Sequence, residues 1–495
     1  MLVNKYILPI NSGSYDYLVI GKNIAKELGL KAQDRVMLQN PKHPDQQTLC
    51  FAEINEGNLK KNSIGIPLRT YEKVKKGLNL KFKIQKEGNI KSIDFIKEKL
   101  DGKKLKENQF QAICKDIVDG NLNDAELAFF VAGCYTNKLT FKEAAGLTKA
   151  IADNGFKLKF RENQIVADKH CIGGVPGNRT TMVVIPIIAS LGIKIPKTSS
   201  RSISSPSGTA DTMEVLAEVD INQEKLEKLV KEQNGFIAWG GGCNLAASDD
   251  ELIRVRRKLG IDPQGLVLAS VMAKKYAAGA THILIDIPYG KFAKVPNLNK
   301  AEELKEKFEK IAKELNLKIK VIITKGNQTI GRGVGPRLEA IDVLKVLKNE
   351  KDAPKDLLEK SLKLAGEILE MIGKAKLNEG YSIAKKQIEN KKAYLKFQEI
   401  IKAQGEKKLP QKAKYQYEIK AWKDGKIKEF NIKLISKIAK IAGSPKSANS
   451  GIEVLVNLKE KLKKDQTIYI IHTNQPGFLN QKIEQYIKES IVISA

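Results

Sequence analysis

The amino-acid sequence predicts a multidomain α/β protein. It has 495 residues, enough for about three domains with substantial cores. Short β-like runs give way to helical periodicity and then to alternating strands and helices, and two glycine- and serine-rich loops enclose a long apolar run near the middle. We predict a β-rich N-terminal domain (1–84), a helical lobe (85–165, completed by about 245–280), a central mixed α/β domain (166–404) and an α+β C-terminal domain (405–495).

The N-terminal domain is predicted from short runs of β-forming residues separated by turn residues. The runs are Tyr6–Pro9, Tyr17–Ile20, Arg35–Leu38 and Leu49–Ile54. The segment Gly29–Gln39 has the form of a turn that leads into a strand, as in small barrels. None of these residues is arranged for catalysis.

The helical lobe is predicted from N-cap signals. Asn123 and Thr140 each stand three residues before a glutamate, Glu126 and Glu143, which is the pattern of a capping box. We therefore expect three or four short helices between residues 92 and 154.

The first central loop combines cations with glycines. Lys169, His170 and Arg179 stand close to Gly173, Gly174 and Gly177, so that cations and backbone N–H groups can converge on an anion without obstruction from Cβ atoms. The apolar run Met182–Leu191 that follows is expected to form an element buried on one side.

The second central loop, residues 197–212, places Arg201 among many small hydroxyl side chains. Hydroxyl groups and a guanidinium are suitable ligands for a sugar or a phosphate. Such glycine- and serine-rich segments are also typical of plain surface loops, so both interpretations remain open at this point.

The segment 259–279 begins with a turn at Asp262 and Pro263 and continues as a helix. Ser270 and Lys274 are four residues apart and share one face of this helix, whereas Lys275 points elsewhere. Aspartate before proline is also a common turn former, so the pattern alone does not assign a role to Asp262.

The strand predicted over Ala280–Pro288 is followed by a loop that carries Lys291 and Lys294. Ligands of α/β proteins gather at such carboxyl ends of strands, although a lone lysine is also typical of an ordinary surface. Further on, we expect a hairpin over Lys412–Phe430 and a structural role for His472 at the end of a strand.

The composition limits the classes of partner. The formal charge is +29, which would suit either nucleic-acid binding or the attraction of phosphorylated small substrates. Because the lysines are spread along the chain in company with glutamate, we expect no nucleic-acid partner. The five cysteines form no CxxC pair, and no apolar run spans a bilayer, so we expect a cytoplasmic protein with no disulfide, zinc site or membrane segment.

Two long motifs carry a resemblance to a known family. DKHxIGGVPGNRTT from residue 168 and KTSSRxIxSPxGTADTMEVL from residue 197 resemble the signature of the thymidine/pyrimidine phosphorylases, most of all their AMP phosphorylase branch. The resemblance implies a helical lobe and central domain of the nucleoside phosphorylase type, orthophosphate as co-substrate, no cofactor, and a homo-oligomer, dimeric or higher. Relatives also carry a monovalent-cation site near the position of Asp342, but we expect no bound metal.

The resemblance also implies roles for individual residues. Asp262 matches the proton donor to the leaving base, and Lys274 matches a base-binding lysine of pyrimidine phosphorylases. The residues that match phosphate ligands are Lys169, Ser199 and Thr209. Those that match other substrate contacts are Gly174, Ser200, Arg201, Ser202, Ile203, Ser204, Ser205, Thr209, Ser270 and Lys294. Cys171 departs from the pattern of the family, because pyrimidine phosphorylases usually have serine there. The resemblance of this position is to the bacterial-type thymidine phosphorylases, which prefer cysteine.

We therefore expect phosphorolysis of AMP, with CMP and UMP as further candidates, to free base and ribose 1,5-bisphosphate. The alternative is a thymidine or pyrimidine-nucleoside phosphorylase that releases (deoxy)ribose 1-phosphate, which Lys274 and Cys171 favour. A noncatalytic nucleic-acid-binding protein is a third hypothesis, supported only by the charge.

Overall fold

The computed structural model describes residues 1–10, 15–57, 59–75, 81–202, 205–243 and 245–494. The chain divides into two compact units, Met1–Gly155 with Ala246–Ala273 and Phe156–Leu245 with Lys274–Ala495. The last of these boundaries falls inside one helix, α11 (Gln264–Ala277), so that Ser270 belongs to the first unit and Lys275 to the second.

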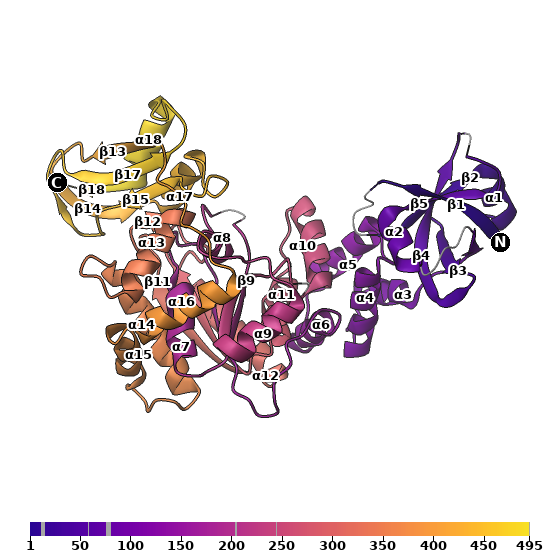
Figure 1. Cartoon of the computed structure of the whole chain (residues 1–495), viewed down its shortest axis with the longest axis horizontal. Coiled ribbons are helices and arrows are strands. Elements are labelled where there is room, and N and C mark those ends of the chain that lie inside the picture. The colour runs from indigo at the N-terminus through magenta and orange to yellow at the C-terminus, as the bar shows by residue number, and fades with distance from the viewer. Residues whose placement is uncertain (11–14, 58, 76–80, 203–204, 244, 495) are drawn as a thin grey trace. The chain divides into compact units, whose positions relative to one another are not determined.

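The first unit begins with a closed β-barrel in the order β1-β5-β2-β4-β3-β6 (Figure 1). Alternating apolar residues such as Ile20, Ile64 and Phe82 fill its interior. Three of the four predicted runs lie within its strands, and the run Tyr6–Pro9 extends one residue beyond β1. The elements are β1 (Leu2–Leu8), β2 (Tyr17–Gly21), α1 (Lys22–Leu28), β3 (Arg35–Asn40), β4 (His43–Asn55), β5 (Ser63–Pro67), α2 (Leu68–Val74) and β6 (Lys81–Lys86).

The rest of the first unit is helical. As predicted, the side chains of Asn123 and Thr140 accept the backbone N–H groups of Glu126 and Glu143, and both capping boxes are complete. A buried ion pair joins Lys99 to Glu143 at 2.8 Å. The helices are α3 (Lys91–Leu100), α4 (Glu107–Asp119), α5 (Asp124–Thr136), α6 (Phe141–Asp153), α10 (Ala247–Leu259) and the first turns of α11.

The central part of the second unit is built on parallel strands. β11 (Lys318–Lys325), β10 (His282–Tyr289) and β7 (Ala167–Cys171) form a three-stranded sheet, and β8 (Ile195–Ser199) pairs with β9 (Gly235–Trp239). A bridge between Val166 and Lys194 links the two sheets. Because all these strands are parallel, the residues that follow β7, β8 and β10 leave the sheet at one edge.

Helix α7 (Thr180–Ser190) corrects one expectation. The apolar run was expected to be buried on one side, but every residue from Thr180 to Ala189 is buried. The helix packs on β7, β8 and β9, while α13 (Pro336–Leu347), α14 (Lys355–Met371), α15 (Gly380–Glu389) and α16 (Lys392–Gln404) also contact it. A helix that is apolar all round is one that is covered all round. The other helices of this part are α8 (Thr209–Glu214), α9 (Gln223–Gln233) and α12 (Leu298–Glu314).

The C-terminal strands correct the hairpin prediction. β13 (Tyr415–Lys420) pairs with β17 (Thr467–Thr473), whereas β14 (Gly425–Phe430) pairs with β16 (Lys461–Leu462) and β18 (Ile491–Ser494). The two strands separate because Ala421 exchanges backbone hydrogen bonds with residues 465 and 466 instead of closing a turn.

Two further features complete this part. His472 is buried on β17, with Nε2 3.0 Å from the Glu453 carboxylate, as a structural histidine would be. The remaining elements are β12 (Gly333–Val334), β15 (Gly451–Val454), α17 (Ile432–Ile441) and α18 (Gln481–Ser490). Among the described residues, no helix is long and apolar enough to cross a membrane.

Candidate active site

The first central loop follows β7, which ends at Cys171, and the second central loop follows β8, which ends at Ser199. Gly174 has a φ of 89°, and a Cβ atom there would lie 2.4 Å from the backbone nitrogen of Lys294. Only glycine permits this approach. Two of the predicted substrate contacts, Gly174 and Lys294, are therefore neighbours.

Lys169 is fully buried on β7. Its Nζ donates to Thr180 Oγ1 at 2.8 Å and to Thr181 Oγ1 at 3.2 Å, at the start of α7. Burial lowers the pKa of Lys169. The hydroxyl partners keep the ammonium in place. Among the described residues it makes no ion pair, although the charge of Asp286 acts on its pKa in the direction opposite to burial.

The Cys171 thiol acts as an acceptor. It receives the backbone N–H of Gly173 and the side-chain N–H of Asn178, both at 3.4 Å. Burial raises the pKa of Cys171, so the side chain is a neutral thiol at neutral pH. Such a group is a weak donor to phosphate and a poor nucleophile.

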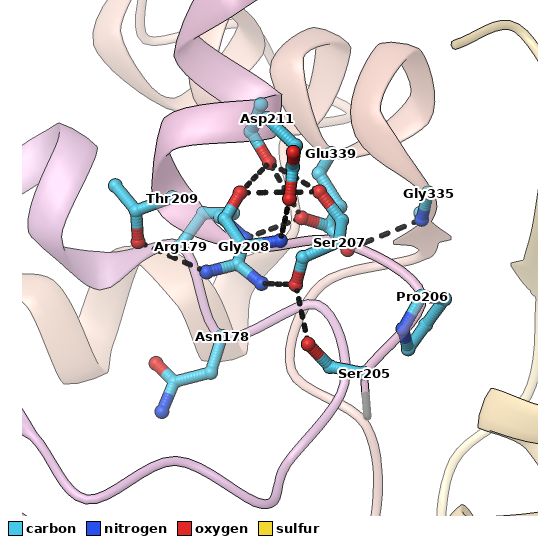
Figure 2. A network of polar contacts seen from close by, with 12 residues as sticks. Asn178, Arg179, Ser205, Pro206, Ser207, Gly208, Thr209, Asp211, Gly335 and Glu339 are labelled. Atoms are coloured by element: carbon cyan, nitrogen blue, oxygen red, sulfur yellow. Dashed lines mark hydrogen bonds and ion pairs between the residues drawn. The ribbon is translucent and has the colours of Figure 1, made fainter. Parts of the chain in front are cut away.

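Arg179, at the start of α7, connects the two loops (Figure 2). Its Nη1 donates to Thr209 Oγ1 at 3.0 Å, its Nη2 donates to the Ser207 carbonyl at 2.8 Å, and its Nε donates to the Glu339 carboxylate. Because Thr209 Oγ1 accepts this bond, its own hydrogen stays available for donation to an anion.

The Glu339 carboxylate is the common acceptor of this hydrogen-bond network. Its side chain is completely buried, and besides Arg179 it accepts the Thr212 hydroxyl at 2.8 Å and the Gly335 N–H at 3.1 Å. One carboxylate therefore fixes the first loop, helix α8 and the start of helix α13 against each other (Figure 2).

The serine-rich loop is folded back on itself. Asp211 accepts the backbone N–H groups of Ser202 at 2.6 Å and Gly208 at 2.7 Å, and Ser205 Oγ donates to the Ser207 carbonyl at 3.0 Å. Within the described residues, Ser199 Oγ donates to the carbonyl of the next residue, Ser200, at 3.4 Å and to no other group. Ile203 and Ser204, which were also predicted to contact the substrate, lie outside the described residues.

Arg201 is half-buried in this loop. It makes two hydrogen bonds to the Glu214 carboxylate, one of them at 2.8 Å, and its guanidinium lies 5.0 Å from the centre of the Trp239 ring. The bond to Arg201 lowers the pKa of Glu214. The guanidinium is thus held in one orientation by a charge and an aromatic face.

The predicted proton donor and one nucleotide contact belong to the first unit. The Asp262 side chain is 82% exposed, and its Oδ1 lies 3.8 Å from Nη1 of the buried Arg256. The Ser270 hydroxyl is buried and donates to Asp249 Oδ2 at 2.7 Å. Lys274, on the last turns of the same helix, is half-buried in the second unit.

A buried charge cluster lies on the other side of β7. Asp168 is 1% exposed, and its Oδ1 is 3.2 Å from Lys275 Nζ and 3.6 Å from Lys197 Nζ, but neither carboxylate oxygen has a hydrogen bond within the described chain. Burial lowers the pKa of Lys275 to about 7. Burial, with Lys275 and Lys197 next in effect, lowers the pKa of His170, so its imidazole is neutral.

The sequence patterns missed several of these residues. Arg179 was noticed as a cation among glycines, but its role as a link between the loops depends on Glu339, which is 160 residues away and has no local signal. Lys275 was set aside as pointing elsewhere. Its position three residues after the buried Met272 was the signal that it lies on the apolar face.

No group of three or more histidine, cysteine, aspartate or glutamate residues is placed to hold a metal ion in the part of the chain that is described. Asp342, near the position where relatives carry a cation site, accepts the backbone N–H groups of Arg332 and Gly333, both at 2.7 Å. Burial raises the pKa of Asp342 to about 7.

Comparisons with known proteins identify the family of the chain. Residues 93–155 match the glycosyl transferase family, helical bundle domain, and residues 163–394 match the glycosyl transferase family, a/b domain. A protein of Legionella pneumophila (strain Corby) named "Putative thymidine phosphorylase" is 43% identical over 391 residues, which are 79% of this chain and 75% of that protein.

Two further proteins extend the comparison. The AMP phosphorylase of Methanococcus vannielii is 37% identical over 491 residues, 98% of this chain and 95% of that protein. In fold, the chain is similar to anthranilate phosphoribosyltransferase from Thermus thermophilus, with a TM-score of 0.53 and 18% identity over 63% of this chain and 99% of that one. The predicted family is therefore confirmed. This chain is a glycosyltransferase-type phosphorylase and belongs to the glycosyl transferase family of the thymidine and AMP phosphorylases.

Proposed function

We propose that the protein cleaves AMP with orthophosphate to adenine and ribose 1,5-bisphosphate, and that CMP and UMP are further substrates. The observation that carries this proposal is the extent of the likeness to AMP phosphorylase. It covers 98% of the chain and so includes the N-terminal barrel, whereas the likeness to the thymidine phosphorylase relative covers 79%.

The surroundings of Arg201 support a substrate that carries its own phosphate. Arg201 lines a surface hollow of about 400 Å³ together with Lys407, Lys408 and Lys446. Asp211 and Glu214 are the two carboxylates of the same hollow, so four cations face two anions. A 5′-phosphate at its edge would meet an attractive field, which a neutral nucleoside would not use.

In this proposal, each part of the site has one task. Lys169, Ser199 and Thr209 hold orthophosphate below the anomeric carbon, and the Arg179 bond leaves the Thr209 hydrogen free for that purpose. As the glycosidic bond breaks, positive charge develops on the sugar ring, and the bound phosphate stabilises it and then attacks. Asp262 donates the proton that the leaving base requires.

Phosphorolysis of thymidine or uridine is the second candidate. It is favoured by the higher identity, 43%, to the thymidine phosphorylase relative and by Lys274, which matches a base-binding lysine of those enzymes. A panel of AMP, CMP, UMP, adenosine, thymidine and uridine, each with and without phosphate, separates the two candidates by release of free base. Phosphate-dependent release from nucleotides supports the proposal, and release from thymidine or uridine alone refutes it.

A variant of Arg201 sharpens this test. Arg201→Gln is expected to raise the KM for AMP by about tenfold or more, the loss of roughly one charge-assisted hydrogen bond. A substrate without a 5′-phosphate should be unaffected. Arg161→Gln, at an exposed position outside the hollow, is the matched control. Equal effects of Arg201→Gln on AMP and adenosine would contradict a 5′-phosphate contact.

The same proposal includes the wider organisation. We take the four predicted domains, 1–84, 85–165 with about 245–280, 166–404 and 405–495, as its functional parts, and a cytoplasmic homo-oligomer without nucleic acid as its working form. Light scattering tests the number of subunits. A salt-sensitive affinity for DNA or RNA in a filter-binding titration would contradict the last point.

A further inference from the structure

The cluster around Asp168 contains more positive than negative charge. Lys197 and Lys275 are 5% and 3% exposed, and both ammonium groups approach the same carboxylate oxygen, at 3.6 Å and 3.2 Å. A buried ion pair is tolerable when each charge has its own partner and its hydrogen bonds are satisfied. Here two cations share one anion whose oxygens have no hydrogen bond among the described residues.

Among the described residues, the groups close to Lys275 give no further negative charge. Lys197 of β8 acts on Lys275 directly, and the charges of Lys169 on β7 and of Lys294 in the loop after β10 act on the neighbouring His170. On its own helix the residues that share its face, Val271 and Met272, are apolar. The burial of a second unpaired ammonium among cations is unfavourable, so the resting cluster is stabilised by the loss of one proton. Burial lowers the pKa of Lys275 to about 7, and the charge of Lys197 acts in the same direction.

The residues of this cluster lie close in sequence to the predicted anion ligands. Lys197 precedes Ser199 by two residues on β8 and so lies on the same face of that strand. Asp168 is adjacent to Lys169 on β7. An anion that binds at Ser199 and Lys169 therefore adds the negative charge that this buried cluster lacks. Because the protein between the anion and the cluster has a low dielectric, the anion interacts strongly with the buried lysines.

We propose that Lys275 is a positioning residue that takes up a proton from solvent when phosphate binds, so that the buried cluster gains its full positive charge only in the occupied site. The inference rests on the proposed function in one respect, namely that phosphate binds beside Lys169 and Ser199. Lys275 does not touch the phosphate. It acts through Asp168, which it shares with Lys197.

Isothermal titration calorimetry measures this proton directly. Phosphate is titrated into the full chain at about pH 8, above its own second pKa, in two buffers of different ionisation enthalpy, and the buffer dependence of the heat gives the protons taken up. We expect close to one proton per phosphate for the wild type and close to none for Lys275→Met. Lys313→Met, at an exposed position of α12, should keep the wild-type value.

A second variant keeps the test decisive if Lys275→Met does not fold. Lys275→Arg keeps the charge at every pH of interest, so it should bind phosphate without proton uptake. If phosphate does not bind to the wild type at all, the proposed function fails. If phosphate binds but the wild type and both Lys275 variants take up the same number of protons, the proposed function survives and this inference is wrong.

Discussion

The two faces of strand β7 differ in how their buried charged groups are paired and hydrogen-bonded. On one face, Lys169 is held by the hydroxyls of Thr180 and Thr181, and nearby Asp286 is paired with Lys360 at 2.9 Å and accepts the Thr324 hydroxyl at 2.7 Å. On the other face, one residue earlier, Asp168 is shared by two lysines and has no hydrogen bond within the described chain.

The difference indicates what each face does. Burial disfavours the charge of Asp286, but Lys360 and Lys169 outweigh it and lower the pKa of this carboxyl, so the first face keeps fixed charges. A site with satisfied, fixed donors is prepared for an anion. The second face holds charges that change with pH and with a bound anion, and such perturbed groups are characteristic of functional sites.

The largest effect is expected on the fixed face. Lys169→Met removes the buried ammonium from the proposed phosphate site and should lower kcat/KM for phosphate by about 100- to 1000-fold, as loss of one preorganised charged donor does. Lys363→Met, exposed on α14, is the control for a lost surface lysine. Initial rates of base release at varied phosphate measure the effect, and a change below about tenfold would remove Lys169 from the phosphate site.

The second effect concerns stability on the variable face. Asp168→Asn removes the one carboxylate that Lys197 and Lys275 share and should destabilise the fold by about 3 kcal/mol at neutral pH. The folded pKa of Lys275 then falls further below its unfolded value. The unfolded chain binds more protons, and stability recovers as the pH rises. Urea unfolding at about pH 7 and pH 9 checks this, and a loss that is independent of pH would contradict it.

A smaller effect is expected where a neutral group can replace a charge with the same shape. Glu339→Gln keeps an acceptor for Thr212 but removes the counter-charge of Arg179. We expect the KM for phosphate to rise about tenfold, equal to about 1.4 kcal/mol, with kcat changed less. Thr209 is the residue through which the change would act, so Thr209→Val in the same background should add little. Fully additive losses would show that Glu339 acts by another route.

The smallest effect is expected at Cys171. Its thiol accepts two weak hydrogen bonds and is a neutral group, so Cys171→Ser should change kcat/KM by less than about threefold, within the usual range for one neutral hydrogen bond. For the same reason the thiol should react slowly with iodoacetamide at about pH 8. Rapid labelling that abolishes activity would place this sulfur in direct contact with the reaction.

The parts of the fold with local signals were predictable. Capping boxes at Asn123 and Thr140 and the alternation in the barrel strands are set by nearest neighbours along the chain. The hairpin expected over Lys412–Phe430 was wrong because β14 pairs with β18, which lies much later in the chain. The local sequence contains no signal for such a distant pairing. The glycines and cations of the central loops indicated an anion site. The buried partner Glu339 depends on tertiary packing and gave no local signal, and the burial of Lys197 and Lys275 is set by the elements that cover them.

Helix α7 has a consequence for how the protein is made. Its residues Thr180–Ala189 are buried on all sides, and two of the helices that cover it, α14 and α16, begin at Lys355 and Lys392. At roughly 5–20 residues per second, a ribosome needs on the order of ten to forty seconds to synthesise the intervening chain. During that time an apolar helix without its cover is exposed to other nascent chains. We expect the growing chain to depend on chaperones until α16 has emerged, and its folding in the cell to be limited by the speed of translation over this stretch.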